Sequence, residues 1–219
     1  MSDQIKVRDP FFSRPHYNLI KNPFHKENPI TVQVLGICSA LAVTAKLKPA
    51  LMLSLSVIVV IVASNIIIAA LRQTIAPRIR IIVQLTVIAM MVILVDQVLK
   101  AFSYEVSKQL SIFVGLIITN CIIMGRLEAF AMSNRVVPAF WDGLGNGIGY
   151  SWILIAVGFF RELLGSGTLL DYPVMEKLGL YQIGYVNNGF MILPPMALIT
   201  VGLIIWWQRS RFTELVDKS

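Results

Sequence analysis

Charged residues are scarce in this sequence. Asp, Glu, Lys and Arg make up only 14% of its 219 residues, whereas about 25% is typical of a soluble domain. Hydrophobic residues make up 56% of the chain, and several uncharged apolar runs approach or exceed the roughly 18 residues that indicate a membrane-spanning helix. The low charge content therefore excludes an ordinary soluble domain and predicts an all-α integral membrane protein.

Apolar residues are also few at the start of the chain. The first apolar run begins only at Ile30, behind a polar, basic stretch, so we expect no cleavable signal peptide. We interpret residues 1–28 as a cytoplasmic arm beside the lipid headgroups, without a fold of its own. The net charge of +7 does not predict a nucleic-acid partner, because in a multi-pass protein the distribution of Lys and Arg reports orientation.

The hydropathy pattern predicts six transmembrane helices within a domain of residues 29–208. We place them at residues 30–44, 50–71, 79–99, 110–125, 148–160 and 190–207. The first begins after Asn28-Pro29, which suits a helix N-cap and first position. This first helix and the fourth are short, because 15 residues rise only about 22 Å and the hydrocarbon layer is about 30 Å thick.

Lys and Arg are distributed unequally between the two sides of these six helices. Of the 19 basic residues, 13 fall on the side of the N-terminal arm. The positive-inside rule then places both termini, including the tail of residues 209–219, in the cytoplasm.

A glycine-rich patch follows the predicted polar loop at residues 126–142. Gly143, Gly145, Gly147 and Gly149 occupy every second position. A phosphate-binding loop is disfavoured, because no strand precedes the patch and no Lys-Ser/Thr pair follows it. Close packing of helices, or an unwound helix start, fits the pattern better.

The six helices divide into two halves of three. An odd number of spans turns the second half upside down relative to the first, so we expect two inverted repeats with short or broken first and fourth helices. Each of these two helices carries one cysteine, Cys38 or Cys121, and the chain has no other.

Two cysteines buried in the membrane permit several interpretations. Each could be a small apolar filler, because free Cys is among the most buried residue types. A disulfide is disfavoured on the cytoplasmic side. Iron–sulfur clusters usually take four thiolates, so a cluster here would need two from a partner.

Three of the charged residues within or at the ends of predicted helices, Asp96, Arg161 and Glu162, could be functional or structural. Asp96 lies four residues before Lys100, a spacing that favours a structural ion pair at the membrane interface over a cation site. We interpret Arg161 and Glu162, at the predicted end of the fifth helix, as a similar structural pair.

Several motifs resemble one known family over residues 28–207. They are Gly-Ile-Cys-Ser-Ala-Leu-Ala-Val-Thr at 36–44, Val-Asp-Gln-Val-Leu-Lys-Ala at 95–101, Ser-Lys-Gln-Leu-Ser at 107–111, Ile-Thr-Asn-Cys-Ile at 118–122, Gly-Arg-Leu-Glu-Ala-Phe-Ala-Met at 125–132 and Gly-Phe-Phe-Arg-Glu-Leu-Leu-Gly-Ser-Gly at 158–167. The chain resembles the family of membrane subunits that includes the D subunit of the sodium-translocating NADH:quinone oxidoreductase.

The resemblance implies membership of a six-subunit complex (A to F) in the bacterial inner membrane. It implies that Cys38 and Cys121 are metal ligands of a 2Fe-2S cluster shared with the E subunit, with subunits A, B, C and F as further partners. FAD, FMN and riboflavin would lie elsewhere in the complex. The cluster would relay electrons from the NADH-oxidising subunit toward FMN and quinone, coupled to Na+ export, and this chain would hold no catalytic residue.

Two alternatives compete with this function. The E subunit of the related Rnf ferredoxin:NAD oxidoreductase complex resembles the same pattern, but Ser39-Ala40 follows the first cysteine here, where that subunit usually has Pro-Leu. An inverted-repeat secondary transporter is the other alternative. It is disfavoured because charge within the predicted helices is scarce.

Overall fold

The computed structural model of the chain describes residues 23, 28–102, 114–170 and 189–211. In order, its helices are α2 (Ile37–Val43), α3 (Leu47–Leu71), α4 (Arg80–Phe102), α6 (Val114–Ile118), α7 (Cys121–Arg126), the π-helix η1 (Leu127–Ala131), α8 (Val136–Ser166), the 3-10 helix η3 (Gly189–Ile192) and α10 (Pro194–Arg211). Each of the six predicted segments contains a helix, and the prediction of an all-helical membrane protein is confirmed.

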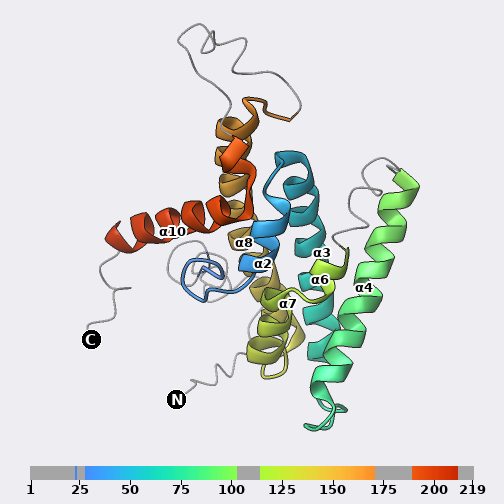
Figure 1. Cartoon of the computed structure of the whole chain (residues 1–219). Coiled ribbons are helices and arrows are strands. Elements are labelled where there is room, and N and C mark those ends of the chain that lie inside the picture. The colour runs from blue at the N-terminus through green and yellow to red at the C-terminus, as the bar shows by residue number, and fades with distance from the viewer. Residues whose placement is uncertain (1–22, 24–27, 103–113, 171–188, 212–219) are drawn as a thin grey trace, which may run out of the picture.

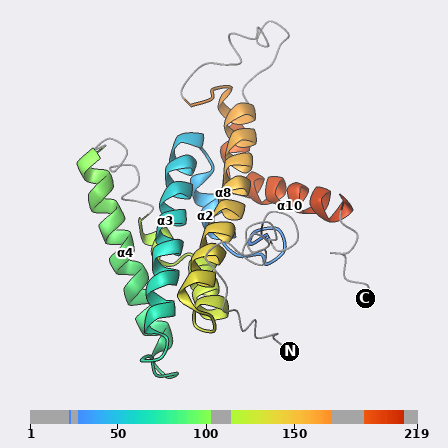
Figure 2. The same cartoon turned by 180° about the vertical axis from the view of Figure 1, so that it is seen from behind.

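Helices α3 and α8 form the centre of the molecule and run antiparallel, side by side (Figures 1 and 2). Near one end, Asn65 Nδ2 of α3 donates to the Ala139 carbonyl of α8 at 3.1 Å. At the other end, the carboxylate of Glu162 in α8 accepts from the backbone N–H of Leu47 in α3. The two helices therefore stay in contact along their length.

Two glycines of the patch, Gly143 and Gly147, lie in the first half of α8 on the contact with α3. A Cβ at Gly147 would lie only 3.3 Å from the backbone Cα of Ile58. Glycine is needed here for the close approach of two backbones, which is how helices associate in a membrane. The packing interpretation of the patch is confirmed.

The prediction of a polar loop at residues 126–142 is wrong. This stretch contains η1 and the first two turns of α8, which begins at Val136 rather than at residue 148. Pro138 does not break the helix because it lies in the first turn, where backbone N–H groups have no partner within the helix. Two of the charged side chains in this stretch, Glu128 and Asp142, are bonded to other helices.

The two short segments are interrupted rather than continuous. Before α2 the chain makes a turn at residues 29–33, capped by Asn28 Oδ1, which accepts from Ile30 N at 3.0 Å. The second segment is divided into α6 and α7 by an extended residue, Asn120. Among the described residues, only α3, α4 and α8 contain candidate membrane spans: Leu47–Leu71, Arg80–Val98 and Val136–Ser166.

The end of the predicted N-terminal arm contacts α8, although most of the arm lies outside the described residues. Pro23 is buried, and its carbonyl oxygen would lie 2.8 Å from a Cβ at Gly149. Asn28 Nδ2 donates to the Gly149 carbonyl at 3.2 Å. Both residues therefore pack against the middle of α8.

Candidate functional site

Cys38 and Cys121 occupy equivalent places at the starts of two short helices. Cys38 is the second residue of α2 and Cys121 is the first residue of α7. Both thiols are free and both residues are exposed at the surface of the chain. Neither thiol is packed inside the isolated chain, as a space-filling cysteine would be.

A network of three buried side chains joins the two turns that carry the cysteines. Ser39 follows Cys38, Asn120 precedes Cys121, and Tyr150 comes from the middle of α8. Ser39 Oγ lies 2.6 Å from the Tyr150 hydroxyl. Asn120 Nδ2 lies 3.4 Å from the Tyr150 hydroxyl and 3.5 Å from Ser39 Oγ. We call these three residues the Tyr150 network, and it brings the two cysteine-bearing turns to one place.

The backbone at Gly36 shapes the first of these turns. Gly36 caps the start of α2 with a φ of +80°, in the left-handed region. A Cβ on this residue would lie 2.9 Å from Cε2 of the Tyr150 ring. Only glycine suits both the conformation and the contact with Tyr150.

The direction of each cysteine follows from its buried neighbour. Successive residues of a helix are about 100° apart around its axis, so burial of Ser39 against Tyr150 turns Cys38 outward. Asn120 Oδ1 accepts from the N–H of Ile122 at 3.3 Å and caps α7. Cys121, between these two buried residues, is exposed.

Sequence reasoning identified the cysteines but missed the Tyr150 network. Polar residues within apolar segments were a usable signal, because such groups are costly in a membrane and are kept when they bond to one another. Ser39 and Asn120 each adjoin a cysteine. Nothing in the sequence places Tyr150 against either of them.

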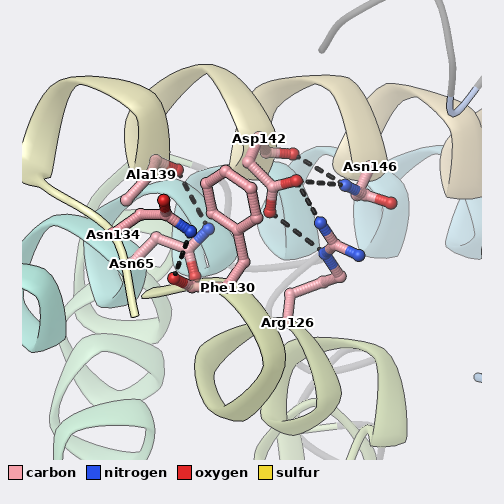
Figure 3. Close-up of polar contacts among 7 residues, drawn as sticks. All are labelled: Asn65, Arg126, Phe130, Asn134, Ala139, Asp142 and Asn146. Atoms are coloured by element: carbon pink, nitrogen blue, oxygen red, sulfur yellow. Dashed lines mark hydrogen bonds and ion pairs between the residues drawn. The ribbon is translucent and has the colours of Figure 1, made fainter. Parts of the chain in front are cut away.

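A second polar cluster joins α7, η1, α3 and α8 (Figure 3). Arg126 Nε donates to Asp142 Oδ2 at 3.0 Å, and Arg126 Nη2 pairs with Asp142 Oδ1. Asn146 Nδ2 donates to Asp142 Oδ1 at 3.1 Å, and the Arg126 guanidinium lies 5.5 Å from the centre of the Phe130 ring. Asp142 is 1% exposed, so this ion pair lies inside the protein.

A third pairing connects α4 to η1. Arg80 Nη2 lies 2.6 Å from Glu128 Oε1, and Gln84 Nε2 donates to Glu128 Oε2 at 2.9 Å. The carboxylate of Glu128 is thus held by two side chains from successive turns of α4. It serves to attach η1 to α4.

The prediction for Asp96 is confirmed, whereas that for Arg161 and Glu162 needs correction. Asp96 Oδ2 pairs with Lys100 Nζ at 2.6 Å. Arg161 and Glu162 are both buried within α8, which continues to Ser166. Each has other partners because their side chains leave the helix in different directions: Arg161 Nη1 donates to Thr44 Oγ1 at 2.6 Å, while Glu162 caps α3.

Arg161 joins the end of α2 to η3. Besides Thr44, it donates to the Leu41 carbonyl at 3.4 Å and to the Ile192 carbonyl at 2.6 Å. These carbonyls lie at helix ends, where backbone acceptors lack partners within the helix. Arg161 is therefore a structural cation that satisfies such acceptors.

Comparison with known proteins identifies relatives over nearly the whole chain. The family described as "Rnf-Nqr subunit, membrane protein" matches residues 16–205. The chain is 50% identical over 202 residues to the D subunit of the Na(+)-translocating NADH-quinone reductase of Shewanella denitrificans, Shewanella halifaxensis and Shewanella oneidensis, covering 91% of this chain and 94% of each relative. The resemblance drawn from the motifs is confirmed.

Proposed function

Because the chain belongs to the Rnf-Nqr family of membrane subunits, we propose that it acts as the D subunit of a Na+-translocating NADH:quinone reductase in a bacterial inner membrane. Its part is to provide half of the ligands of an intramembrane 2Fe-2S cluster shared with the E subunit. The observation that carries this proposal is the pairing of two exposed cysteines on turns joined by one hydrogen-bond network.

The residues present fit such a cluster. Thiolate sulfur is its usual ligand, and Cys38 and Cys121 are the only cysteines in the sequence. Two ligands must then come from another chain, and exposure of both thiols suits an interface with that chain. When bound, the cluster would supply one-electron transfer between the NADH-oxidising side of the complex and its flavin and quinone side.

The first turn fits the quinone reductase better than the Rnf complex. The corresponding E subunit of the Rnf complex usually has Pro where this chain has Ser39. The Ser39 hydroxyl bonds to both the Gly36 carbonyl, at 2.8 Å, and Tyr150. Proline has no hydroxyl and could make neither bond.

The inverted-repeat arrangement is part of the proposal. Corresponding long helices of the two halves, α3 and α8, run antiparallel. An arginine near the C-terminal end of each one bonds to the segment before the other: Arg161 to Leu41 and Thr44, and Arg72 Nη1 to the Ser133 carbonyl at 3.2 Å. An axis in the membrane plane would relate these contacts.

Orientation completes the proposal. The positive-inside rule places residues 1–28 and 209–219 in the cytoplasm, on either side of a membrane domain of residues 29–208. An alkaline phosphatase fused to Ser219 should therefore be inactive. An active fusion would reverse the orientation.

The test of the proposed function is replacement of each cysteine in the whole complex. Cys38→Ser and Cys121→Ser should each remove or strongly perturb one iron–sulfur signal in low-temperature EPR, because a serine oxygen is a harder and poorer ligand for such a cluster than the thiolate sulfur. NADH-driven quinone reduction should be lost. NADH oxidation by soluble electron acceptors should remain, because those electrons do not enter the membrane.

Ser54→Ala is a matched control for these variants. Ser54 is buried on α3, and its hydroxyl donates to the carbonyl of Leu51 in the same helix, at 2.7 Å. This variant should retain wild-type iron content and activity. Full iron stoichiometry and full quinone reduction in both cysteine variants would show that the thiols only fill space.

A further inference from the structure

The Tyr150 network points to a positioning role beyond the cysteines themselves. We propose that Tyr150 sets the spacing and direction of the Cys38 and Cys121 thiols by bonding to both turns at once, and thereby tunes the metal centre they hold. This inference rests on the proposed function, since it concerns the same pair of thiols. Tyr150 itself contacts neither metal nor substrate and acts through Ser39 and Asn120.

The hydrogens of the network can be assigned from its partners. Ser39 has one hydroxyl hydrogen, and Ser39 Oγ donates it to the Gly36 carbonyl at 2.8 Å. The 2.6 Å contact with Tyr150 then requires the tyrosine O–H to donate to Ser39 Oγ. Asn120 Nδ2 donates to the oxygens of Tyr150 and Ser39. Because these two oxygens are only 2.6 Å apart, a single N–H of Asn120 is shared between them, and the tyrosine hydroxyl lies between the two turns.

Tyr150 is well supported for this role. Its side chain is fully buried. Its ring lies against Gly36, and there is room for the ring because glycine has no Cβ. It comes from α8, which packs along the length of α3. Sites supported by a rigid helix are held more accurately than sites held by loops alone.

The two turns depend on tertiary contacts for their relative position. The helices that carry the thiols are only seven and six residues long, too short to be stable without such contacts. Hydrogen bonds beyond the ligands of a metal typically change its affinity by about 10- to 100-fold when removed. Loss of the tyrosine hydroxyl would remove the nearer of the two donors to Ser39 Oγ. It would also remove one of the acceptors of Asn120 Nδ2.

The experiment compares four forms of the purified whole complex: wild type, Tyr150→Phe, Ser39→Ala and Ser151→Ala. Phenylalanine retains the ring against Gly36 and removes only the hydroxyl. Ser151 is the matched control, because it is the next residue of α8, is buried, and donates to the Gly147 carbonyl at 2.8 Å on the side of α3. The readout is the EPR signal that Cys38→Ser and Cys121→Ser abolish.

Tyr150→Phe should retain this signal with changed g values and a changed midpoint potential. Its iron should be lost to a chelator roughly tenfold faster than in wild type. Ser39→Ala should shift the same three quantities in the same direction, because it removes the same bond from the side of α2. Ser151→Ala should behave as wild type.

The other outcomes separate this inference from the proposed function. Wild-type values in both Tyr150→Phe and Ser39→Ala would overturn the positioning role, while loss of the signal in the cysteine variants would leave the proposed function standing. Equal shifts in Ser151→Ala would also overturn it. If Tyr150→Phe fails to assemble, Ser39→Ala decides alone. A signal that stays unchanged in both cysteine variants would end both proposals.

Discussion

The inner helices α3 and α8 and the outer helices α4 and α10 are built differently. In an apolar 18-residue stretch of each helix, the share that is buried inside the chain is 50% for α3 and 56% for α8, but only 17% for α4. The inner pair carries glycine and buried polar side chains at its contact. The outer pair directs large apolar side chains away from the bundle, such as Ile82 and Met90 on α4 and Leu203, Trp206 and Trp207 on α10.

This difference reflects what stabilises helices in a membrane. Lipid is as apolar as leucine, so hydrophobicity does not by itself hold two helices together there; close packing and hydrogen bonds do. Helices α3 and α8 have both. Helix α10 instead extends away from α8 in both views (Figures 1 and 2), and its two tryptophans suit a membrane interface.

The largest expected effect comes from filling the inner contact. Gly147→Leu should abolish or greatly reduce the assembled complex, because a Cβ would already lie 3.2–3.3 Å from Ile58 and Ile61, so the remaining carbons of leucine cannot fit unless the two helices separate. The measurement is the yield of whole complex by size-exclusion chromatography.

Gly202→Leu on α10 is the matched control for this substitution. A Cβ at Gly202 would have no heavy atom within 4 Å among the described residues. The yield of whole complex with Gly202→Leu should therefore match that of wild type. Normal assembly of Gly147→Leu would show that the inner contact can open, and the contrast between inner and outer helices would fail.

A smaller effect is expected from the inner ion pair. Arg126→Met leaves Asp142 buried without its cation, which typically costs about 3–5 kcal/mol for a fully buried pair. Partial exposure of Arg126 places the expected loss at the lower end of this range. The temperature at which the purified complex loses its native oligomer should fall.

A double variant sharpens this test. Arg126→Met with Asp142→Leu removes both charges, so stability should recover at least in part. If the double variant is no more stable than Arg126→Met, the cost does not come from the unpaired carboxylate.

The smallest effect is expected from the outer ion pair. Lys100→Met removes the cation beside Asp96 on α4, where the lysine is 43% exposed. Asp96 is 13% exposed, but a pair whose cation is solvated contributes only about 1 kcal/mol, so the same thermal measurement should change less than for Arg126→Met. A loss as large as that of Arg126→Met would show that α4 is held as firmly as the inner helices.

Several features could be predicted from the sequence because they depend on composition and local order. Low charge content was sufficient for the membrane class. The spacing of Asp96 and Lys100 was sufficient for their pairing, since residues four apart share a helix face. The motifs around Cys38 and Cys121 were sufficient for the family.

Other features depended on contacts between distant segments. The polar residues at 126–142 indicate a loop when taken alone, and only the partners of Arg126 and Glu128 on other helices allow them to be helical. Arg161 and Glu162 are neighbours in sequence but serve opposite ends of different helices.

Sequence alone thus determined that the chain is a helical membrane subunit with two cysteines in short hydrophobic segments, because hydropathy and motifs are local properties. Tertiary structure alone decided that both thiols are exposed and that Tyr150, 112 residues after Cys38 in the chain, joins the two turns that carry them. The physical reason is that a hydrogen bond between segments depends on how α8 packs against α2 and α7, and no local pattern encodes that packing.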